Sequence, residues 1–168
     1  MSKKKKWIIV VSSILAVVAI GLGVGLGVGL SGRIWYKAHI FGGRFGWQDT
    51  EEGIFELVTS LDELKEICDT YDNPAFSEEY FAYLTSMGAK LREYDGTYFS
   101  DKAVIIFSTT GNSKRFKIKK IYVKNKELIL DINYKEYKHG HALWLEYTTI
   151  IIEINKADIL GITDMKTI

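Results

Sequence analysis

The chain has 168 residues, a formal net charge of +1 and 47% apolar residues, with one proline and one cysteine. This composition excludes a collagen-like chain, a disulfide-stapled scaffold and a compositionally disordered chain. The near-neutral charge gives no general reason to expect binding to nucleic acid. The length suits a single domain with an appended segment, and it names no activity.

A long uncharged stretch follows a basic N-terminus. Residues 7–30 carry no charged side chain, and four lysines at residues 3–6 precede them. As a helix this stretch would reach about 36 Å, more than the hydrocarbon core of about 30 Å. Because basic residues stay on the cytoplasmic side, we expect residues 1–6 to be a cytoplasmic tail and residues 7–30 a transmembrane signal anchor.

The alternative for residues 7–30 is a cleaved secretory signal. The apolar run exceeds the about 7–15 residues of such a signal, and no A-x-A cleavage site follows it. Both interpretations place residues 31–168 outside the cytoplasm. We therefore expect a single-pass protein of the cell membrane, with its C-terminal domain extracellular.

Glycines alternate with leucine and valine in the second half of this stretch. Gly21, Gly25 and Gly29 form two overlapping G-x-x-x-G units, a spacing that lets two membrane helices approach closely. Gly23 and Gly27 form a similar pair on nearly the opposite face. Low-complexity apolar sequence is therefore the favoured interpretation, and a helix–helix contact through Gly21, Gly25 and Gly29 is the alternative.

Residues 31–48 are rich in aromatic side chains and glycine. Aromatic side chains settle at the headgroup level of a membrane, and the glycines favour a flexible chain, so we expect a juxtamembrane tether. Its aromatic residues are Trp35, Tyr36, Phe41, Phe45 and Trp47.

Residues 49–168 are expected to form one extracytoplasmic domain that begins with a strand at residues 54–59. Ser60 and Glu63 then form a capping box that opens a helix. Asn73-Pro74 breaks the chain, and Ser77 caps a second helix, which ends before Asp95-Gly96. The helical part is therefore confined to the first half of the domain.

Strand patterns fill the second half of the domain. Residues 103–109 predict a central strand, and the alternation along residues 116–123 slips at Lys119-Lys120, which predicts a β-bulge. Asn125-Lys126 is expected to form a tight hairpin turn. Further strands are predicted at residues 128–134 and 148–154, a helical turn at residues 156–160 and an edge strand at residues 162–168. The predicted class is α+β, with an N-terminal transmembrane helix, then one strand and two helices, followed by an antiparallel β-meander.

The cysteine and the histidines give little indication of a catalytic or metal-binding site. Cys68 is the sole cysteine and lies beside the apolar side of the first predicted helix, so a buried, inert thiol is the favoured interpretation. His139 and His141 resemble a metal-ligand pair, with Glu136 as the nearest third ligand. Two histidines in a loop are common without a metal, so we expect no metal and no cofactor. Nucleophile-elbow, zincin, phosphate-loop and dinucleotide motifs are all missing from the sequence, which favours a non-enzyme.

Charge is segregated along the chain. Residues 1–48 carry +7, residues 49–101 carry −11, residues 102–138 carry +7 and residues 139–168 carry −2. The alternation of a strand puts Arg115, Lys117 and Lys119 on one face. Such a row can bind an anionic partner; the competing interpretations are a solvated sheet face and a contact between this basic hairpin and the acidic helices. The candidate anion- or partner-binding residues are Lys114, Arg115, Lys117, Lys119, Lys120, Lys124 and Lys126.

The C-terminal half resembles a group of small bacterial domains. Tyr98-Phe99 leads into AVIIF, TGNS, FKIKKI and KELILDI, and the chain closes with IIEINKADILGI. These segments resemble uncharacterised secreted or membrane-attached domains of low-GC Gram-positive bacteria. They are also similar to the C-terminal domain of PrcB-type protease-complex subunits, which are non-catalytic. The resemblance covers residues 98–162, departs from the expected pattern over residues 135–149, carries over no functional residues and implies an accessory or interaction domain.

We therefore expect a membrane-anchored extracytoplasmic interaction domain without catalytic activity. Its expected partners are the bilayer and an envelope polymer or another membrane or secreted protein, and not nucleic acid. One alternative is a structural subunit of a membrane complex that associates through the glycine-rich helix. The other is a hydrolase whose site is assembled only in three dimensions, with Cys68 or His141 beside a carboxylate.

Overall fold

The computed structural model describes residues 33–46, 53–77, 86–111, 113–135 and 146–168. The chain divides into two compact units, Met1–Arg33 and Ile34–Ile168. Every helix and strand described below belongs to the second unit.

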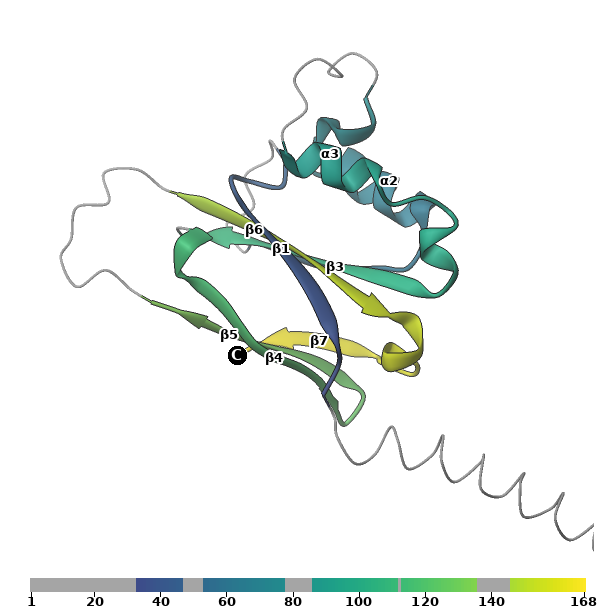
Figure 1. Cartoon of the computed structure of the whole chain (residues 1–168), viewed down its shortest axis with the longest axis vertical. Helices are drawn as coiled ribbons and strands as arrows, with labels where there is room; N and C mark the ends of the chain where they lie inside the picture. Colours follow the sequence, from purple (N-terminus) through teal and green to yellow (C-terminus); the bar gives the residue numbers. More distant parts are fainter. Residues whose placement is uncertain (1–32, 47–52, 78–85, 112, 136–145) are drawn as a thin grey trace, which may run out of the picture. The chain divides into compact units, whose positions relative to one another are not determined.

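A four-stranded antiparallel sheet forms the middle of this unit (Figure 1). Its strand order is β1-β6-β3-β2. β1 and β6 therefore lie side by side, although more than a hundred residues separate them in the sequence. The strands are β1 (Tyr36–Gly42), β2 (Ile54–Val58), β3 (Lys102–Thr110) and β6 (Tyr147–Asn155).

A three-stranded sheet of order β4-β5-β7 packs against one face of the first sheet. β4 (Phe116–Lys124) and β5 (Glu127–Tyr134) form an antiparallel hairpin, whereas β7 (Asp164–Thr167) runs parallel to β5. Between the sheets lies an aliphatic core in which Ile105, Ile150 and Ile152 face the second sheet's Ile121, Leu128 and Leu130.

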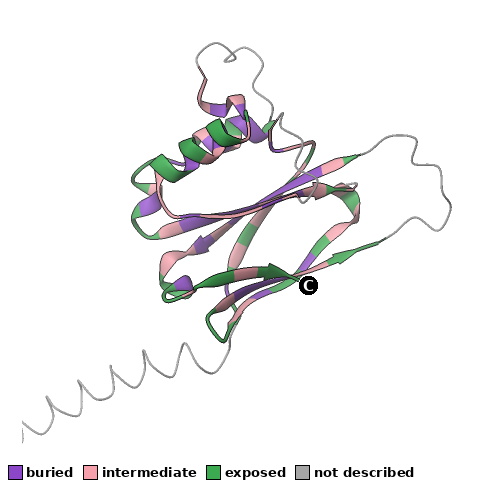
Figure 2. Cartoon of the chain, turned by 180° about the vertical axis from the view of Figure 1, so that it is seen from behind, coloured by how far each residue is buried: buried purple, intermediate pink, exposed green. Residues whose placement is uncertain are grey.

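Two helices cover the other face of the four-stranded sheet (Figure 1). These are α2 (Leu61–Thr70) and α3 (Ser86–Arg92), and their Leu64, Cys68 and Leu91 pack against strand residues that include Ile106 and Ile151. Burial is concentrated on the inner strands, as Figure 2 shows. Because both faces of β3 and β6 are covered, their sequences are nearly continuous apolar runs rather than alternating patterns.

Short 3-10 helices complete the unit at its turns. They are η1 (Pro74–Phe76), η3 (Tyr98–Ser100), η4 (Ser113–Arg115) and η5 (Lys156–Ile159). The first follows the predicted break at Asn73-Pro74, and the last corresponds to the helical turn predicted at residues 156–160.

Local signals in the sequence are confirmed at the start of α2. The Ser60 side chain accepts a hydrogen bond from the Glu63 N–H at 3.1 Å, and the Glu63 carboxylate accepts one from the Thr59 N–H at 2.6 Å. The first contact satisfies a donor that the first turn of a helix leaves without an intrahelical partner, and the second ties the Glu63 side chain to the residue before the cap.

The hairpin between β4 and β5 is also as predicted. Asn125 and Lys126 form its two-residue turn with φ values of +55° and +66°, the combination that suits the right-handed twist of a hairpin. The pairing register shifts between Ile118 and Lys120, which is the predicted bulge at Lys119-Lys120. Phe116 and Ile118 before the bulge and Ile121 and Val123 after it therefore all belong to the core.

The predicted fold class is wrong in its architecture. The structure has two stacked sheets instead of one meander, and its last strand is parallel to its neighbour. Residues 36–42, expected in an aromatic tether, form β1 and pair with β6, and Phe45 is buried. Alternation identifies a strand but does not say which sheet it joins, because that depends on pairing across more than a hundred residues of sequence.

The membrane prediction is also corrected. Across the five described ranges, no helix is long and apolar enough to cross a bilayer. The predicted anchor, residues 7–30, and its glycines Gly21, Gly25 and Gly29 lie outside the described residues. The predicted transmembrane helix, the single-pass cell-membrane localisation and the extracellular placement of the C-terminal domain are therefore not supported.

Candidate functional site

The seven basic residues predicted to bind an anionic partner are divided between strand β4 and its two ends. Lys117, Lys120 and Lys124 are exposed on the outer face of β4, which points away from the core between the sheets. Within the described ranges no ion pair involves these three side chains. The Lys120 ammonium lies 4.6 Å from the centre of the Tyr122 ring. We call Lys117, Lys120, Tyr122 and Lys124 the basic strand face.

The other four candidates are placed differently. Lys114 and Arg115 precede the strand in η4, and the Arg115 guanidinium donates to the Lys135 carbonyl at 3.0 Å. Lys119 lies in the bulge, with its ammonium 3.4 Å from the Asp131 carboxylate. Lys126 occupies the hairpin turn.

The proposed contact between the basic hairpin and the acidic helices is wrong. The hairpin and the helices pack on opposite faces of the four-stranded sheet, as Figure 1 shows. The exposed acids of α2 therefore lie on the far side of the domain from the basic strand face; they are Asp62, Glu63, Glu66 and Asp69.

Cys68 is fully buried in the core beneath α2. Burial, together with the nearby charge of Asp69, raises the pKa of its thiol to about 12. A thiol with this pKa forms almost no thiolate near neutral pH, which agrees with the predicted inert side chain. His139 and His141 lie outside the described residues, within which no cluster of three His, Cys, Asp or Glu side chains suits a metal ion.

A second polar site, which the sequence did not reveal, lies on the helix-side face of the four-stranded sheet. Glu153 is on the inner strand β6, and its side chain is only 16% exposed. Three groups surround its Oε1 atom: His39 Nε2 at 2.9 Å, Lys90 Nζ at 2.8 Å and the Tyr94 hydroxyl at 3.0 Å. We call His39, Lys90, Tyr94 and Glu153 the Glu153 cluster.

The members of the Glu153 cluster come from three parts of the fold. His39 is on β1, which pairs directly with β6, while Lys90 lies in the last turn of α3 and Tyr94 just after it. The cluster thus joins an edge strand, an inner strand and a helix. The Lys90 ammonium also lies 2.8 Å from the Glu93 carboxylate, so it bridges two acids.

The electrostatics of the cluster favour its charged form. Burial alone would raise the pKa of Glu153, but hydrogen bonds from Lys90, Tyr94 and His39 lower it below its ordinary value. Burial alone would lower the pKa of Lys90, but its contacts with Glu153 and Glu93 raise it. Burial and the Glu153 charge raise the pKa of the Tyr94 hydroxyl, which therefore remains a proton donor.

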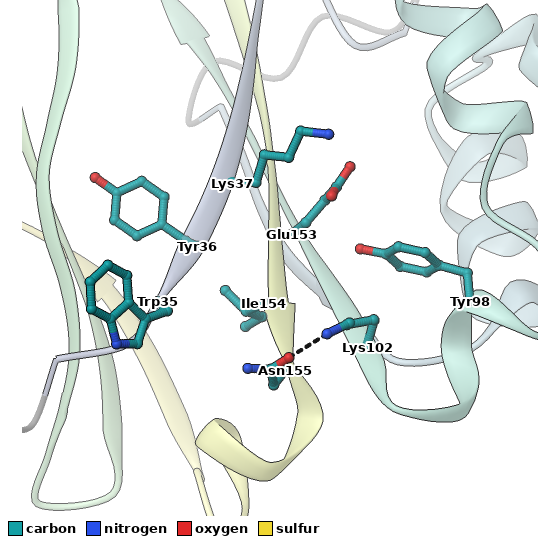
Figure 3. Close-up of a pocket in the computed structure, with 8 residues that line it drawn as sticks. All are labelled: Trp35, Tyr36, Lys37, Tyr98, Lys102, Glu153, Ile154 and Asn155. Atoms are coloured by element: carbon teal, nitrogen blue, oxygen red, sulfur yellow. Dashed lines mark hydrogen bonds between the residues drawn. The ribbon is translucent and has the colours of Figure 1, made fainter.

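A pocket of about 250 Å³ lies beside Glu153 (Figure 3). It is bordered by the start of β1, the end of β6, the start of β3 and η3. Figure 3 shows the Tyr98 ring opposite the end of β6, with its hydroxyl directed toward the Glu153 side of the pocket. The lining residues are Trp35, Tyr36, Lys37, Tyr98, Lys102, Glu153, Ile154 and Asn155.

One signal in the sequence could have identified Glu153. It is the only charged residue in Tyr147–Asn155, the strand richest in isoleucine. A carboxylate inside such a run must face either solvent or a compensating partner. Its partners could not have been identified, because His39, Lys90 and Tyr94 are each separated from it by more than fifty residues.

No protein-family model, curated protein or solved structure matches the chain. The resemblance to PrcB-type and other Gram-positive domains therefore stays a prediction.

Proposed function

We propose that residues 34–168 form a non-catalytic binding domain whose basic strand face binds an extended acidic segment of a partner protein. One observation carries this proposal. Lys117, Lys120 and Lys124 project from the same face of one strand, and no ion pair neutralises them within the described residues.

The spacing of these lysines suits an extended partner. Side chains on one face of a strand recur about every 7 Å. Tyr122 stands between Lys120 and Lys124, which therefore lie about 14 Å apart, and Lys117 precedes Lys120 across the bulge. An extended segment with alternating acids can place a carboxylate opposite each of these lysines. Two ammonium groups about 14 Å apart repel each other by about 0.3 kcal/mol in water. A partner with alternating acids relieves that repulsion along the strand.

The surroundings of the basic strand face favour a protein over a uniform polyanion. Carboxylates flank the lysines on the same sheet, where Asp131 pairs with Lys119 and Glu127 pairs with Lys166. A uniformly charged polymer or lipid surface would meet these carboxylates as well as the lysines. A protein segment can place its acids opposite the lysines and neutral residues opposite Asp131 and Glu127.

The test compares two double variants of equal net charge. Lys117→Gln with Lys124→Gln removes two ammonium groups from the basic strand face and leaves the Lys120–Tyr122 contact intact. Lys37→Gln with Lys65→Gln removes two exposed ammonium groups from β1 and α2, away from the basic strand face. Binding of a labelled peptide with alternating glutamate and serine is measured by fluorescence anisotropy at low and physiological salt.

We expect the first double variant to bind the peptide about tenfold more weakly, a loss of about 1.4 kcal/mol. The control should bind like the parent, and the difference should shrink as salt is added. Absence of binding by the parent, or an equal loss in the control, would refute a specific role for this face. Tighter binding to polyphosphate or to anionic vesicles than to the peptide would contradict the choice of a protein partner.

A further inference from the structure

One edge of the four-stranded sheet has no partner strand among the described residues. β2 pairs with β3 on one side, and no described strand pairs with its other side. Because the N–H and C=O groups of a strand point alternately to its two sides, about half of those of β2 are directed away from β3. Such a row of backbone groups is a template for a further strand.

The two sheets are joined at their β1–β4 edge but not at their β2–β7 edge. At the first edge the Ile34 N–H donates to the Ile121 carbonyl at 2.8 Å, and the Tyr36 hydroxyl donates to the Ile118 carbonyl at 3.3 Å. Within the described ranges no hydrogen bond joins β2 to β7. The core between the sheets is therefore accessible from the β2–β7 edge.

A groove of about 400 Å³ lies at this edge, between β2 and the start of β7. Phe55 and Leu57 line it from β2, and Ile162 and Met165 line it from the other sheet. All four side chains pack against the core between the sheets, yet they are only half-buried. Because alternate residues of a strand point to the same face, every second side chain of a strand added beside β2 enters this groove.

The surroundings of β2 are acidic. Glu56 points to the helix side of β2, where its carboxylate accepts a hydrogen bond from the Tyr71 hydroxyl at 3.2 Å. Residues 54–70, which include β2 and α2, contain five acids and one lysine. Asp164, at the groove, is exposed. A basic side chain on a strand added beside β2 therefore stands close to Glu56 and gains from its charge.

We propose that β2 pairs with an extended segment of a partner protein in which apolar and basic residues alternate. The segment joins the four-stranded sheet as a fifth strand, with its apolar side chains in the groove and its basic side chains on the side of Glu56. Main-chain hydrogen bonds to β2 supply affinity, and the groove selects apolar residues at alternate positions. The inference is independent of the basic strand face, which belongs to β4 on the other sheet.

The same charges disfavour a second copy of the chain as the occupant. Pairing of β2 with β2 of another copy would bring together two copies of residues 54–70, each with five acids and one lysine. Like charges across such an interface repel each other, whereas a basic segment is attracted. The basic strand β4 of another copy cannot fill the groove, because its apolar side chains belong to the core of its own domain.

The test uses a peptide of alternating valine and lysine and the methionine methyl resonances of the full chain, observed by NMR. Met165 lines the groove, whereas Met87 is buried under α3 on the helix side of the four-stranded sheet (Figure 1). Each resonance is assigned by its disappearance in Met165→Leu or Met87→Leu. A peptide of alternating valine and glutamate is the control.

We expect the valine–lysine peptide to shift the Met165 resonance saturably and to leave the Met87 resonance unchanged. The valine–glutamate peptide should shift neither, because the acids around β2 repel it. Glu56→Gln, which keeps an acceptor for the Tyr71 hydroxyl, should weaken binding of the valine–lysine peptide about threefold. Glu93→Gln removes an exposed acid just after α3 and should leave this binding unchanged.

Two modified peptides test the main-chain pairing without any change to the protein. One carries an N-methyl group on every valine, and the other carries one on every lysine. These two sets of N–H groups point to opposite edges of the extended peptide, and only one edge can face β2. One modified peptide should therefore bind like the unmodified peptide, and the other about tenfold more weakly or worse.

Four results would overturn the proposal. An unchanged Met165 resonance, or equal shifts of the Met165 and Met87 resonances, would exclude a site in this groove. Equal binding of the two N-methylated peptides would contradict pairing with β2. A shift of the Met165 resonance by the valine–glutamate peptide as large as that by the valine–lysine peptide would contradict the basic character of the partner. A Met165 shift that grows with the concentration of the protein alone, with a dimer in sedimentation, would identify a second copy as the occupant.

Discussion

Charged side chains differ in burial and pairing between the helix-side face of the four-stranded sheet and the outer face of the three-stranded sheet. On the first, the Glu153 carboxylate is 16% exposed and three side chains contact one of its oxygens. On the second, Lys117, Lys120 and Lys124 are exposed and form no ion pair within the described residues.

The difference follows from solvation. A charge removed from water loses several kcal/mol of hydration, which close partners must offset. An exposed lysine keeps its hydration, and a partner contributes at most about 1 kcal/mol. The Glu153 cluster is therefore important for the stability of the domain, whereas the basic strand face is available for binding.

Removal of the central carboxylate is the strongest test of this comparison. Glu153→Ala leaves the Lys90 ammonium and the Tyr94 hydroxyl without their shared acceptor, and both groups are largely buried. We expect the free energy of unfolding to fall by about 2 to 3 kcal/mol, as measured by urea denaturation at neutral pH.

Glu127→Ala is the matched control on the other sheet. It removes the carboxylate that pairs with Lys166 at the surface, and we expect a loss below about 1 kcal/mol. Equal losses in the two variants would show that burial does not distinguish the two faces.

The pH dependence of stability should show the next effect. The pKa of Glu153 is below its ordinary value of 4.5 in the folded chain, so its stabilising contribution is complete above that value and is lost as pH falls through the lowered pKa. The pKa of Lys90 is above its ordinary value of 10.5, so its contribution is complete below that value and is lost as pH rises through the raised pKa.

The stabilising contributions of Glu153 and Lys90 should therefore both be complete between about pH 5 and about pH 10. In urea denaturation from pH 7 to pH 3, the parent should lose more stability than Glu153→Gln, which has no carboxylate to protonate at this position. Parallel curves for the two proteins would contradict a lowered pKa of Glu153.

Features that depend on neighbouring residues could be predicted from the sequence. The cap at Ser60 and Glu63, the bulge at Lys119-Lys120 and the turn at Asn125-Lys126 are all confirmed. Each depends on residues within one turn or one strand, where side-chain spacing determines the geometry directly.

Features that depend on distant residues could not be predicted. The pairing of β1 with β6 joins Lys37 to Glu153, and the resulting position of His39 completes the Glu153 cluster. The aromatic and glycine content of residues 31–48 was compatible with a tether, and nothing in that segment indicates the strand with which it pairs. For the same reason, the parallel pairing of β7 with β5 had no local signature.

Two neighbouring tyrosines offer a finer comparison. Tyr94 donates to Glu153, whereas the Tyr98 hydroxyl has no partner within the described residues, and their ring centres lie 4.6 Å apart. Tyr94→Phe should lower the free energy of unfolding by about 1 kcal/mol, whereas Tyr98→Phe, which removes a buried hydroxyl that has no partner, should raise it by about 1 kcal/mol. Urea denaturation of both variants tests this, and the opposite order would show that the Tyr98 hydroxyl has a structural partner.

The smallest effect is expected on the basic strand face. Lys117→Gln with Lys124→Gln breaks no ion pair and relieves repulsion from the Lys120 ammonium between them. The free energy of unfolding should therefore stay within about 0.5 kcal/mol of the parent value, or rise slightly at low salt. Thermal and urea denaturation at two salt concentrations measure this change.

A loss above about 1 kcal/mol would mean that these lysines stabilise the fold, and any weaker binding of the acidic peptide would then be a consequence of unfolding. A neutral result, together with the tenfold loss of peptide binding, would separate binding from stability on this face, in contrast to the Glu153 cluster.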